Sequence, residues 1–152
     1  MIITFAGHAS VPYDNKIKEL VKTQIRNNIM NCESVVCYLG GYGNFDEICA
    51  QACRELRQEY SCIQVVYVTP YITLSEQEKI KTFQNYGLYD TSIYPPIEHV
   101  PPKFAISKRN EWMMSKADLV IAYINHNYGG AYKSIQTAKR KKKKTINIFD
   151  FL

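Results

Sequence analysis

Two glycine-rich segments hold the residues of this chain whose types and spacing best fit ligand chemistry. The first is GGYG at residues 40–43, followed closely by Asp46 and Glu47. Glycine lacks a Cβ and accepts positive φ, so a ligand can come close to the backbone amides of such a segment. A helix that begins near Asp46 would add free amide groups and a partial positive charge. The segment could therefore seat a phosphate, hold a sugar or form only a tight turn.

The carboxylates of Asp46 and Glu47 separate these alternatives. In the first turn of a helix they would repel a phosphate and compete for the same amides. A carboxylate there is better suited to accept hydrogen bonds from ribose hydroxyls, or simply to cap the helix. Both interpretations stay open, and direct phosphate contact ranks behind them. The G-x-G-x-x-G spacing of a Rossmann dinucleotide fingerprint is absent.

The second segment, Gly129 and Gly130, is the better site for an anion. The residues that follow it are AYKS at 131–134, and the expected helix contains no acid. Free amides, a hydroxyl and an ammonium group can all face a phosphate there without a competing carboxylate. This segment predicts phosphate contact, with an ordinary turn as the alternative.

Three further polar residues lie beside expected strands. Arg109 and Asn110 are on a helix that precedes an apolar run, and Arg109 either reaches a phosphate or makes a surface ion pair. His8 follows Gly7 directly after the first apolar run. It could contact a ligand, and a hydrogen-bonded loop histidine is the alternative.

Cysteine usage and charge narrow the class of protein. None of the five cysteines has a metal-ligand spacing, and Cys49 and Cys53 would share one face of a helix, so we expect buried, reduced thiols and no metal or cofactor. The net charge of +5 comes from the run KRKKKK at 139–144. Cations at a helix C-terminus complement its dipole, which we favour over nucleic-acid binding for this run.

The pattern of apolar runs predicts the elements that position these residues. Strands are expected over 2–6, 34–39, 63–68, 91–94, 118–123 and 145–149. Helices are expected over 15–29, 46–59, 75–85, 103–116 and 131–141. Alternation of this kind predicts a three-layer Rossmann-like α/β fold with a mainly parallel sheet and helices on both faces, in one domain over 1–152. The apolar N-terminal run is too short for a signal peptide or membrane span, and we expect a cytoplasmic protein.

The expected topology also predicts where the site lies. Ligands of open α/β sheets bind outside the carboxyl ends of the strands. The segments that follow the first, second and penultimate expected strands are GHAS, GGYGNFD and NHNYGGAY. All three are rich in glycine or small polar residues, so we expect them to form one shared pocket.

Four segments in order resemble the SLOG superfamily, the Rossmann-like domains shared by LOG phosphoribohydrolases and the DNA-processing protein DprA. They are FAGH at 5–8, GGYGNFDEICAQACRELRQEY at 40–60, KRNEWMMSKADLVIAY at 108–123 and GGAYKSIQTAKRKKKKTINI at 129–148. The R-N-x-x-M and G-G-A motifs resemble in particular the small YspA/YpsA-like members. The resemblance covers nearly all of the chain and is weakest over residues 70–103.

The resemblance implies a nucleotide or a nucleotide-derived, ADP-ribose-like ligand between the glycine segments. By motif position, the residues implied on one side are Gly40, Gly41, Gly43 and Asp46; those on the other are Arg109, Asn110, Gly129 and Gly130; and Gly7 and His8 lie at the edge. The resemblance also implies a homodimer.

Hydrolysis by a LOG-like mechanism is less well supported by the sequence. LOG enzymes have a glutamate after the second glycine segment, where this chain has Gln136, and their lysine is replaced by Asn110. A neutral amide cannot stabilise the sugar cation that forms as the N-glycosidic bond breaks. Candidate catalytic residues are therefore Asp46, Glu47 and Arg109.

We expect a nucleotide-binding protein, acting as a sensor or by sequestering its ligand. The first alternative is a nucleoside monophosphate phosphoribohydrolase, and the second is a DprA-like protein associated with DNA. The expected partner is a small nucleotide, with nucleic acid less favoured and no membrane.

Overall fold

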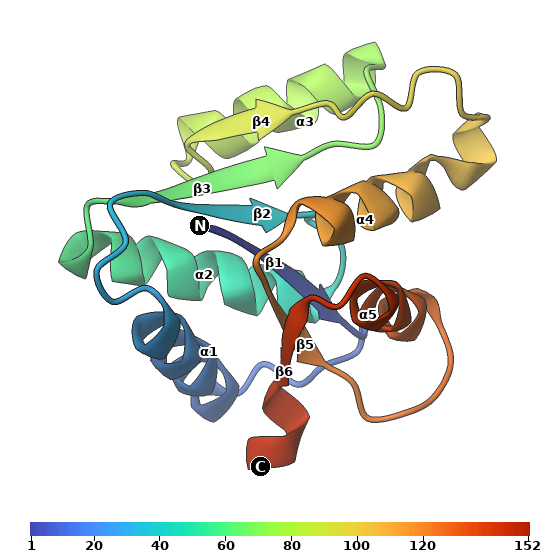
Figure 1. The fold of residues 1–152 in the computed structure, drawn as a ribbon. Helices are drawn as coiled ribbons and strands as arrows, with labels where there is room; N and C mark the ends of the chain where they lie inside the picture. The colour runs from blue at the N-terminus through green and yellow to red at the C-terminus, as the bar shows by residue number, and fades with distance from the viewer.

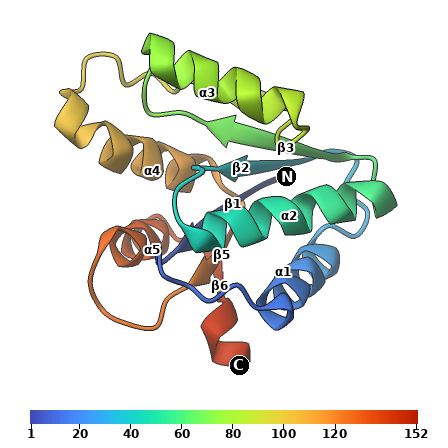
Figure 2. The same ribbon diagram turned by 180° about the vertical axis from the view of Figure 1, so that it is seen from behind.

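The computed structural model describes residues 1–152 and contains one six-stranded parallel sheet in the order β4-β3-β2-β1-β5-β6, with helices on both faces (Figures 1 and 2). The strands are β1 (Ile2–Gly7), β2 (Val35–Leu39), β3 (Ile63–Val68), β4 (Thr91–Ile93), β5 (Leu119–Tyr123) and β6 (Lys144–Asn147). The α-helices are α1 (Asn15–Asn28), α2 (Asn44–Glu59), α3 (Leu74–Asn85), α4 (Ala105–Lys116) and α5 (Gly130–Arg140), with 3-10 turns η1 (Pro102–Phe104) and η2 (Ile148–Phe151). The Rossmann-like α/β prediction is confirmed.

The strand order reverses at β1. From β1 the chain builds β2, β3 and β4 outward in one direction, and it then returns across the sheet through α4 to place β5 on the other side of β1. Such a reversal opens a crevice outside the carboxyl ends of the two central strands, because their following connections diverge to opposite faces. The segments after β1 and β5 therefore border the same crevice.

The core consists of two apolar layers, one on each face of the sheet. The larger cluster has 25 buried residues and joins α1 and α2 to the sheet, with η2 packed beside them. The smaller cluster has nine and joins α4 and α5 to the other face. All five residues of β5 are buried, as expected for a central parallel strand covered on both sides. The sheet is therefore a rigid platform for the segments at its carboxyl edge.

α1 begins as the sequence predicted, because the Asp14 side chain accepts a hydrogen bond from the amide of Lys16. Ile17, Val21 and Ile25 form its buried stripe. Their spacing places one apolar face against the sheet and leaves the polar face free for contacts with α2.

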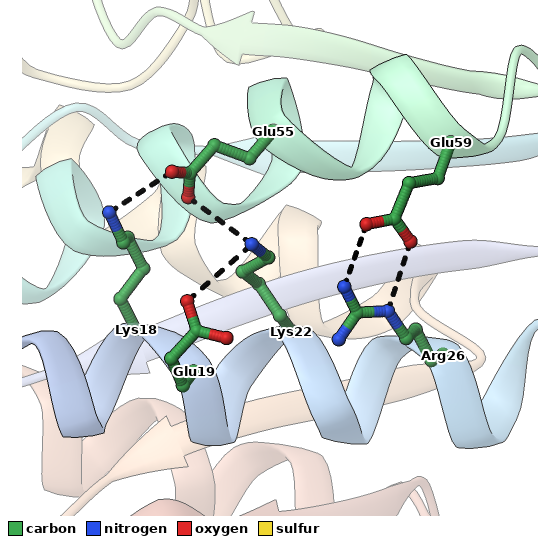
Figure 3. Close-up of polar contacts among 6 residues, drawn as sticks. All are labelled: Lys18, Glu19, Lys22, Arg26, Glu55 and Glu59. Carbon is green, nitrogen blue, oxygen red and sulfur yellow. Dashed lines mark hydrogen bonds and ion pairs between the residues drawn. The ribbon is translucent and has the colours of Figure 1, made fainter.

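Ion pairs link the exposed faces of α1 and α2 (Figure 3). Glu55 on α2 accepts from Lys18 at 3.1 Å and lies 3.7 Å from Lys22, and Arg26 pairs with Glu59 at 2.8 Å. Exposed pairs of this kind contribute about 0–1 kcal/mol each. They pair the charges that α2 presents to α1.

The last strand is shorter than the sequence predicted. It ends at Asn147, and residues predicted to continue it to Phe149 instead form η2. The Asn147 side chain accepts from the Phe149 amide and exchanges two hydrogen bonds with the backbone of Ile124. This local bonding turns the chain away from the sheet.

Two helices start two residues away from the predicted position, and α3 and α5 each start one residue earlier than predicted. α2 begins at Asn44 rather than Asp46, because Gly43 at φ +87° ends the preceding loop. The segment predicted as one helix over 103–116 is divided into η1 and α4. None of the helices combines the length and the hydropathy that a membrane span requires.

All five cysteines are free thiols. Cys49 and Cys53 are fully buried on the inner face of α2, which confirms their predicted placement on one buried helical face.

Candidate functional site

A cleft of about 560 Å³ lies at the carboxyl ends of β1 and β5. Its walls come from the turn after β1, the start of α2, one face of α4 and the loop from β5 into α5. Of the residues that the sequence singled out, it is lined by Gly7, His8, Asp46, Arg109, Asn110, Gly129 and Gly130. The two glycine-rich segments therefore meet in one cleft, where Tyr42 and Asp46 of the first face Gly129 and Gly130 of the second.

The glycines of the first segment do not line this cleft. A Cβ at Gly40 would stand 3.0 Å from the guanidinium carbon of Arg109, and one at Gly41 would stand 2.5 Å from the ring of Tyr67. A Cβ at Gly43 would meet the Cα of Ala9 at 2.8 Å. Packing against the protein accounts for these glycines, and the residues that this segment presents to the cleft are those with side chains.

Arg109 is buried in the wall of the cleft, with 2% of its surface exposed. Its Nη1 donates to the carbonyl oxygens of Gly40 at 3.0 Å and Val68 at 2.8 Å, and its Nε donates to the side chain of Asn110 at 2.9 Å. The alternative of a surface ion pair is therefore wrong. Burial lowers the pKa of Arg109 and the nearby carboxylate of Asp46 raises it. The guanidinium ties the ends of β2 and β3 to α4.

Asp46 is in the first turn of α2 and faces the cleft. Its Oδ2 accepts a hydrogen bond from the Tyr42 amide at 3.1 Å, so it ties the loop before α2 to the first turn of the helix. Burial raises the pKa of Asp46 to about 6, against the opposing effects of that amide and of Arg109. The carboxyl can therefore exchange a proton near neutral pH and offers an oxygen to a ligand hydroxyl.

Glu47 is not brought to this cleft. Its carboxylate accepts a hydrogen bond from the hydroxyl of Tyr13, and it lines a different hollow between α2 and α3. Of the two adjacent carboxylates, only Asp46 is placed for chemistry beside the second glycine segment.

The N-terminus of α5 opens into the cleft without a cap. Gly129 precedes the helix at φ +93°, no side chain caps it, and its first turn contains no acid. A Cβ added at Gly129 or Gly130 would meet no atom within 4 Å, so the backbone here faces open space. Ser134 lines the same wall, one turn further along. Free amides at the positive end of a helix dipole are suited to an anion.

Three stacked side chains hold the loop between β5 and α5 against the end of β1. The rings of His8 and His126 are 3.5 Å apart and nearly parallel, and Tyr128 lies 4.0 Å from His126. The Nε2 of His8 is buried without a hydrogen-bond partner. Burial, and then the neighbouring His126, lower the pKa of His8. The three rings therefore form an aromatic wall between the end of β1 and the loop after β5.

Two tyrosines that the sequence reasoning passed over stand at the mouth of the cleft. Tyr42 is 68% exposed and Tyr128 is 70% exposed, and both line the cavity. Each is adjacent to a glycine of one of the two segments, in GGYG and NYGG. That repeated pairing of tyrosine with glycine is the signal that could have identified them.

A basic groove between α4 and α5 continues from this cleft. The lining residues that the two hollows share are Ile106, Asn110, Gly130 and Ser134. The groove adds three cations and one acid: Lys103, Lys133, Arg140 and Glu111. The run of cations at 139–144 is thus divided. Arg140 lines the groove, whereas the last lysine of the run bonds to the side chain of a residue at the end of α1. No three His, Cys, Asp or Glu side chains cluster closely enough to hold a metal ion.

No protein-family model matches the sequence, and a comparison with curated proteins gives no match. Among solved structures, DNA processing protein A (DprA) from Streptococcus pneumoniae matches with a TM-score of 0.64 at 15% identity, over 94% of this chain and 48% of that one. DprA from Helicobacter pylori matches with a TM-score of 0.60 at 15% identity, over 95% of this chain and 63% of that one. This chain spans about half to two thirds of the length of those structures. It shares the Rossmann-like fold of these DprA proteins.

Proposed function

We propose that the cleft at the carboxyl ends of β1 and β5 binds a nucleotide, in a SLOG-like domain that acts as a sensor or sequesters its ligand. The observation that carries the proposal is the uncapped N-terminus of α5, which opens into the same cavity as the Asp46 carboxyl and two exposed tyrosines. The helix N-terminus can bind a phosphate, the Asp46 carboxyl can accept hydrogen bonds from a sugar, and the tyrosine rings can stack on a base.

The phosphate position is the first turn of α5. The first turn of α5 contains no carboxylate that would compete for the amides after Gly129 and Gly130, and Lys133 is exposed one turn away. Ribose hydroxyls fit between the Asp46 carboxyl and the Asn110 side chain on the opposite wall. A base would stack on the exposed rings at the mouth, since aromatic stacking accepts any base.

Calorimetric titration and thermal shift with AMP, GMP, CMP, UMP, cyclic nucleotides and ADP-ribose test this proposal. A ligand that binds only the folded state raises stability by RT ln(1 + [L]/Kd). We expect stabilisation by nucleotides and weaker stabilisation by ribose 5-phosphate, which lacks the base. Absence of binding by every nucleotide would overturn the proposal.

Single-stranded nucleic acid is the second candidate ligand, because the basic groove of Lys103, Lys133 and Arg140 continues from the cleft. The Helicobacter pylori structure of similar fold is described with a single-stranded DNA binding mode. Affinity for oligothymidylates that rises with length and falls with salt would favour this candidate. Neutralising those three residues should then remove the length dependence, whereas neutralising the lysines at 141–143 should not.

One observation favours hydrolysis of a bound nucleotide: the Asp46 carboxyl lies inside the cleft with a pKa of about 6. We propose binding without hydrolysis, since no second acid faces Asp46 across the cavity. Release of free base from a nucleoside monophosphate, abolished in Asp46→Asn, would reverse this part of the proposal. Pairing of two copies is part of the same proposal, and light scattering of the purified protein tests it.

A further inference from the structure

A second cleft of about 400 Å³ lies between α2 and α3, on the far side of the first glycine segment. Phe83, Leu88 and Tyr89 form its apolar floor, and the backbone of Gly41 and Gly43 forms one end. Its size is within the range of small-molecule sites, which combine apolar walls with a few polar groups.

One face of α2 supplies the polar wall of this α2–α3 cleft. Glu47, Ala50, Gln51 and Arg54 recur at spacings of three and four residues, which places them in one row along the helix. Ala50 is the small member at the centre of the row, so the space above it stays open. The two charged residues stand two turns apart, or roughly 10 Å along the helix axis.

Arg54 differs from every other charged residue of α2. Glu55, Arg57 and Glu59 each form an ion pair, and Figure 3 shows the pairs of the two glutamates. Asp46 accepts a hydrogen bond from the Tyr42 amide, and Glu47 accepts one from the Tyr13 hydroxyl. The half-buried side chain of Arg54 has no hydrogen bond or ion pair. Because the Arg54 guanidinium has no protein acceptor, it is free to form charge-assisted hydrogen bonds with an anion from solution.

The hydroxyl of Tyr89 is a second donor without a protein partner. The side chain is 8% exposed, and its ring packs 5.3 Å from the ring of Tyr67 and 5.4 Å from that of Phe83. Burial, and then the charge of Asp46, raise the pKa of Tyr89, whereas the charge of Arg54 lowers it. The cleft therefore holds a rigid phenol and a free guanidinium beside an aromatic wall.

We propose that the α2–α3 cleft binds a small planar monoanion, a carboxylic acid with a single ring. The carboxylate bonds to Arg54 and the Tyr89 hydroxyl, and the ring packs on Phe83 and Leu88. A monoanion is favoured over a phosphate dianion because Glu47 adds a negative charge to the same wall. The site is separate from the nucleotide cleft, because the two clefts have no lining residue in common.

Titration of the full-length isotope-labelled chain with benzoate, followed by amide chemical shifts, tests the proposal. We expect saturable shifts at Gly41, Gly43, Gln51 and Leu88. Phenyl phosphate should bind several-fold more weakly, and neutral benzyl alcohol should cause no saturable shift at these amides. Nucleotide added to the same sample should shift a different set, around Gly129 and Gly130.

Substitutions distinguish specific binding at this cleft from nonspecific binding of benzoate. Arg54→Leu should weaken benzoate binding about tenfold or more, and Tyr89→Phe by several-fold, because each removes one donor to the carboxylate. Gln58→Leu, exposed on α2 outside the cleft, should change nothing. Equal binding of benzoate to Arg54→Leu, equal binding of benzyl alcohol to the natural chain, or no benzoate shifts at the cleft would each overturn the proposal. The folded spectrum of each variant is its own control for unfolding.

Discussion

The guanidinium of Arg109 occupies the space that a side chain at Gly40 would need. Its Nη1 donates to the carbonyl of Gly40 at 3.0 Å, and its central carbon would lie 3.0 Å from a Cβ at that position. The same nitrogen donates to Val68 at 2.8 Å. A glycine at the end of β2 and an arginine on α4 thus form one unit that closes the wall of the candidate site.

This unit predicts strong coupling between residues 40 and 109. Gly40→Ala should destabilise the natural chain by about 1–2 kcal/mol, because the guanidinium must move from a packed position. Arg109→Met should cost about 2–4 kcal/mol, since it leaves two buried carbonyl groups without their donor. Urea denaturation of both single variants and of the double variant measures these values.

In the double variant, Gly40→Ala should cost little, because methionine can move away from the added methyl group. The coupling free energy should then be roughly 1 kcal/mol or more. Strict additivity of the two substitutions would show that residue 40 needs to be glycine for another reason.

The open first turn of α5 predicts a variant in which stability and ligand binding change in opposite directions. Ala131→Glu places an acid at the positive end of the helix dipole and should stabilise the fold by roughly 0.3–1 kcal/mol. The same carboxylate would repel a bound phosphate and compete for its amides, so nucleotide affinity should fall about tenfold or more. Thermal melts and calorimetric titration measure the two effects.

Gln58→Glu is the matched control, because it adds the same charge to an exposed position of α2. It should leave nucleotide affinity unchanged. If Ala131→Glu binds nucleotide as well as the natural chain, the phosphate does not lie at the N-terminus of α5.

The exposed tyrosines at the cleft mouth predict a loss of affinity without a loss of stability. Tyr42→Ala and Tyr128→Ala each remove a ring on which a base can stack, a contact that contributes about 1–3 kcal/mol. Nucleotide affinity should fall roughly 5- to 150-fold, and the affinity for ribose 5-phosphate should stay the same. Tyr86→Ala, at a 78% exposed position beyond α3, is the control and should change neither nucleotide affinity nor stability.

The fold follows from local pattern to a large extent. The apolar runs predicted six strands, and β3 has the predicted bounds. Its run is apolar and buried except at Gln64, and Thr69 and Pro70 follow it directly. The two glycine segments follow β2 and β5, the two strands that flank β1. In a parallel sheet the carboxyl ends of these strands lie at the same edge, so the sequence predicted that the segments meet. The end of β6 depends on the side chain of Asn147, which accepts hydrogen bonds from the amides of Ile124 and Phe149. The periodicity of apolar residues does not reveal such hydrogen bonds.

The roles of single site residues were harder to predict, because they depend on contacts between distant parts of the chain. GGYG alone indicates a close backbone approach, and it does not say whether a ligand or Tyr67 makes that approach. For Arg109, the sequence left open a contact with a phosphate or a surface ion pair. Its burial depends on carbonyl groups at the ends of two strands.

Asp46 predicts a pH-dependent difference in stability between the natural chain and Asp46→Asn. Burial raises the pKa of this carboxyl from its ordinary value of 3.8 to about 6 in the folded protein. The folded state therefore binds this proton more tightly than the unfolded state does, and stability falls as pH rises from about 4 through 6. Asparagine keeps an oxygen for the Tyr42 amide and carries no charge to bury.

The variant should thus equal the natural chain in stability near pH 4 and exceed it at pH 8, by roughly 2–3 kcal/mol for a pKa difference of about two. Urea denaturation at a series of pH values measures the difference, and Asp150→Asn, exposed on η2, controls for the loss of one negative charge. A natural chain more stable than the variant at pH 8 would mean that Arg109 and the helix amides outweigh burial. In that case Asp46 would be ionised at neutral pH, and its contact with a ribose would be that of a permanent carboxylate.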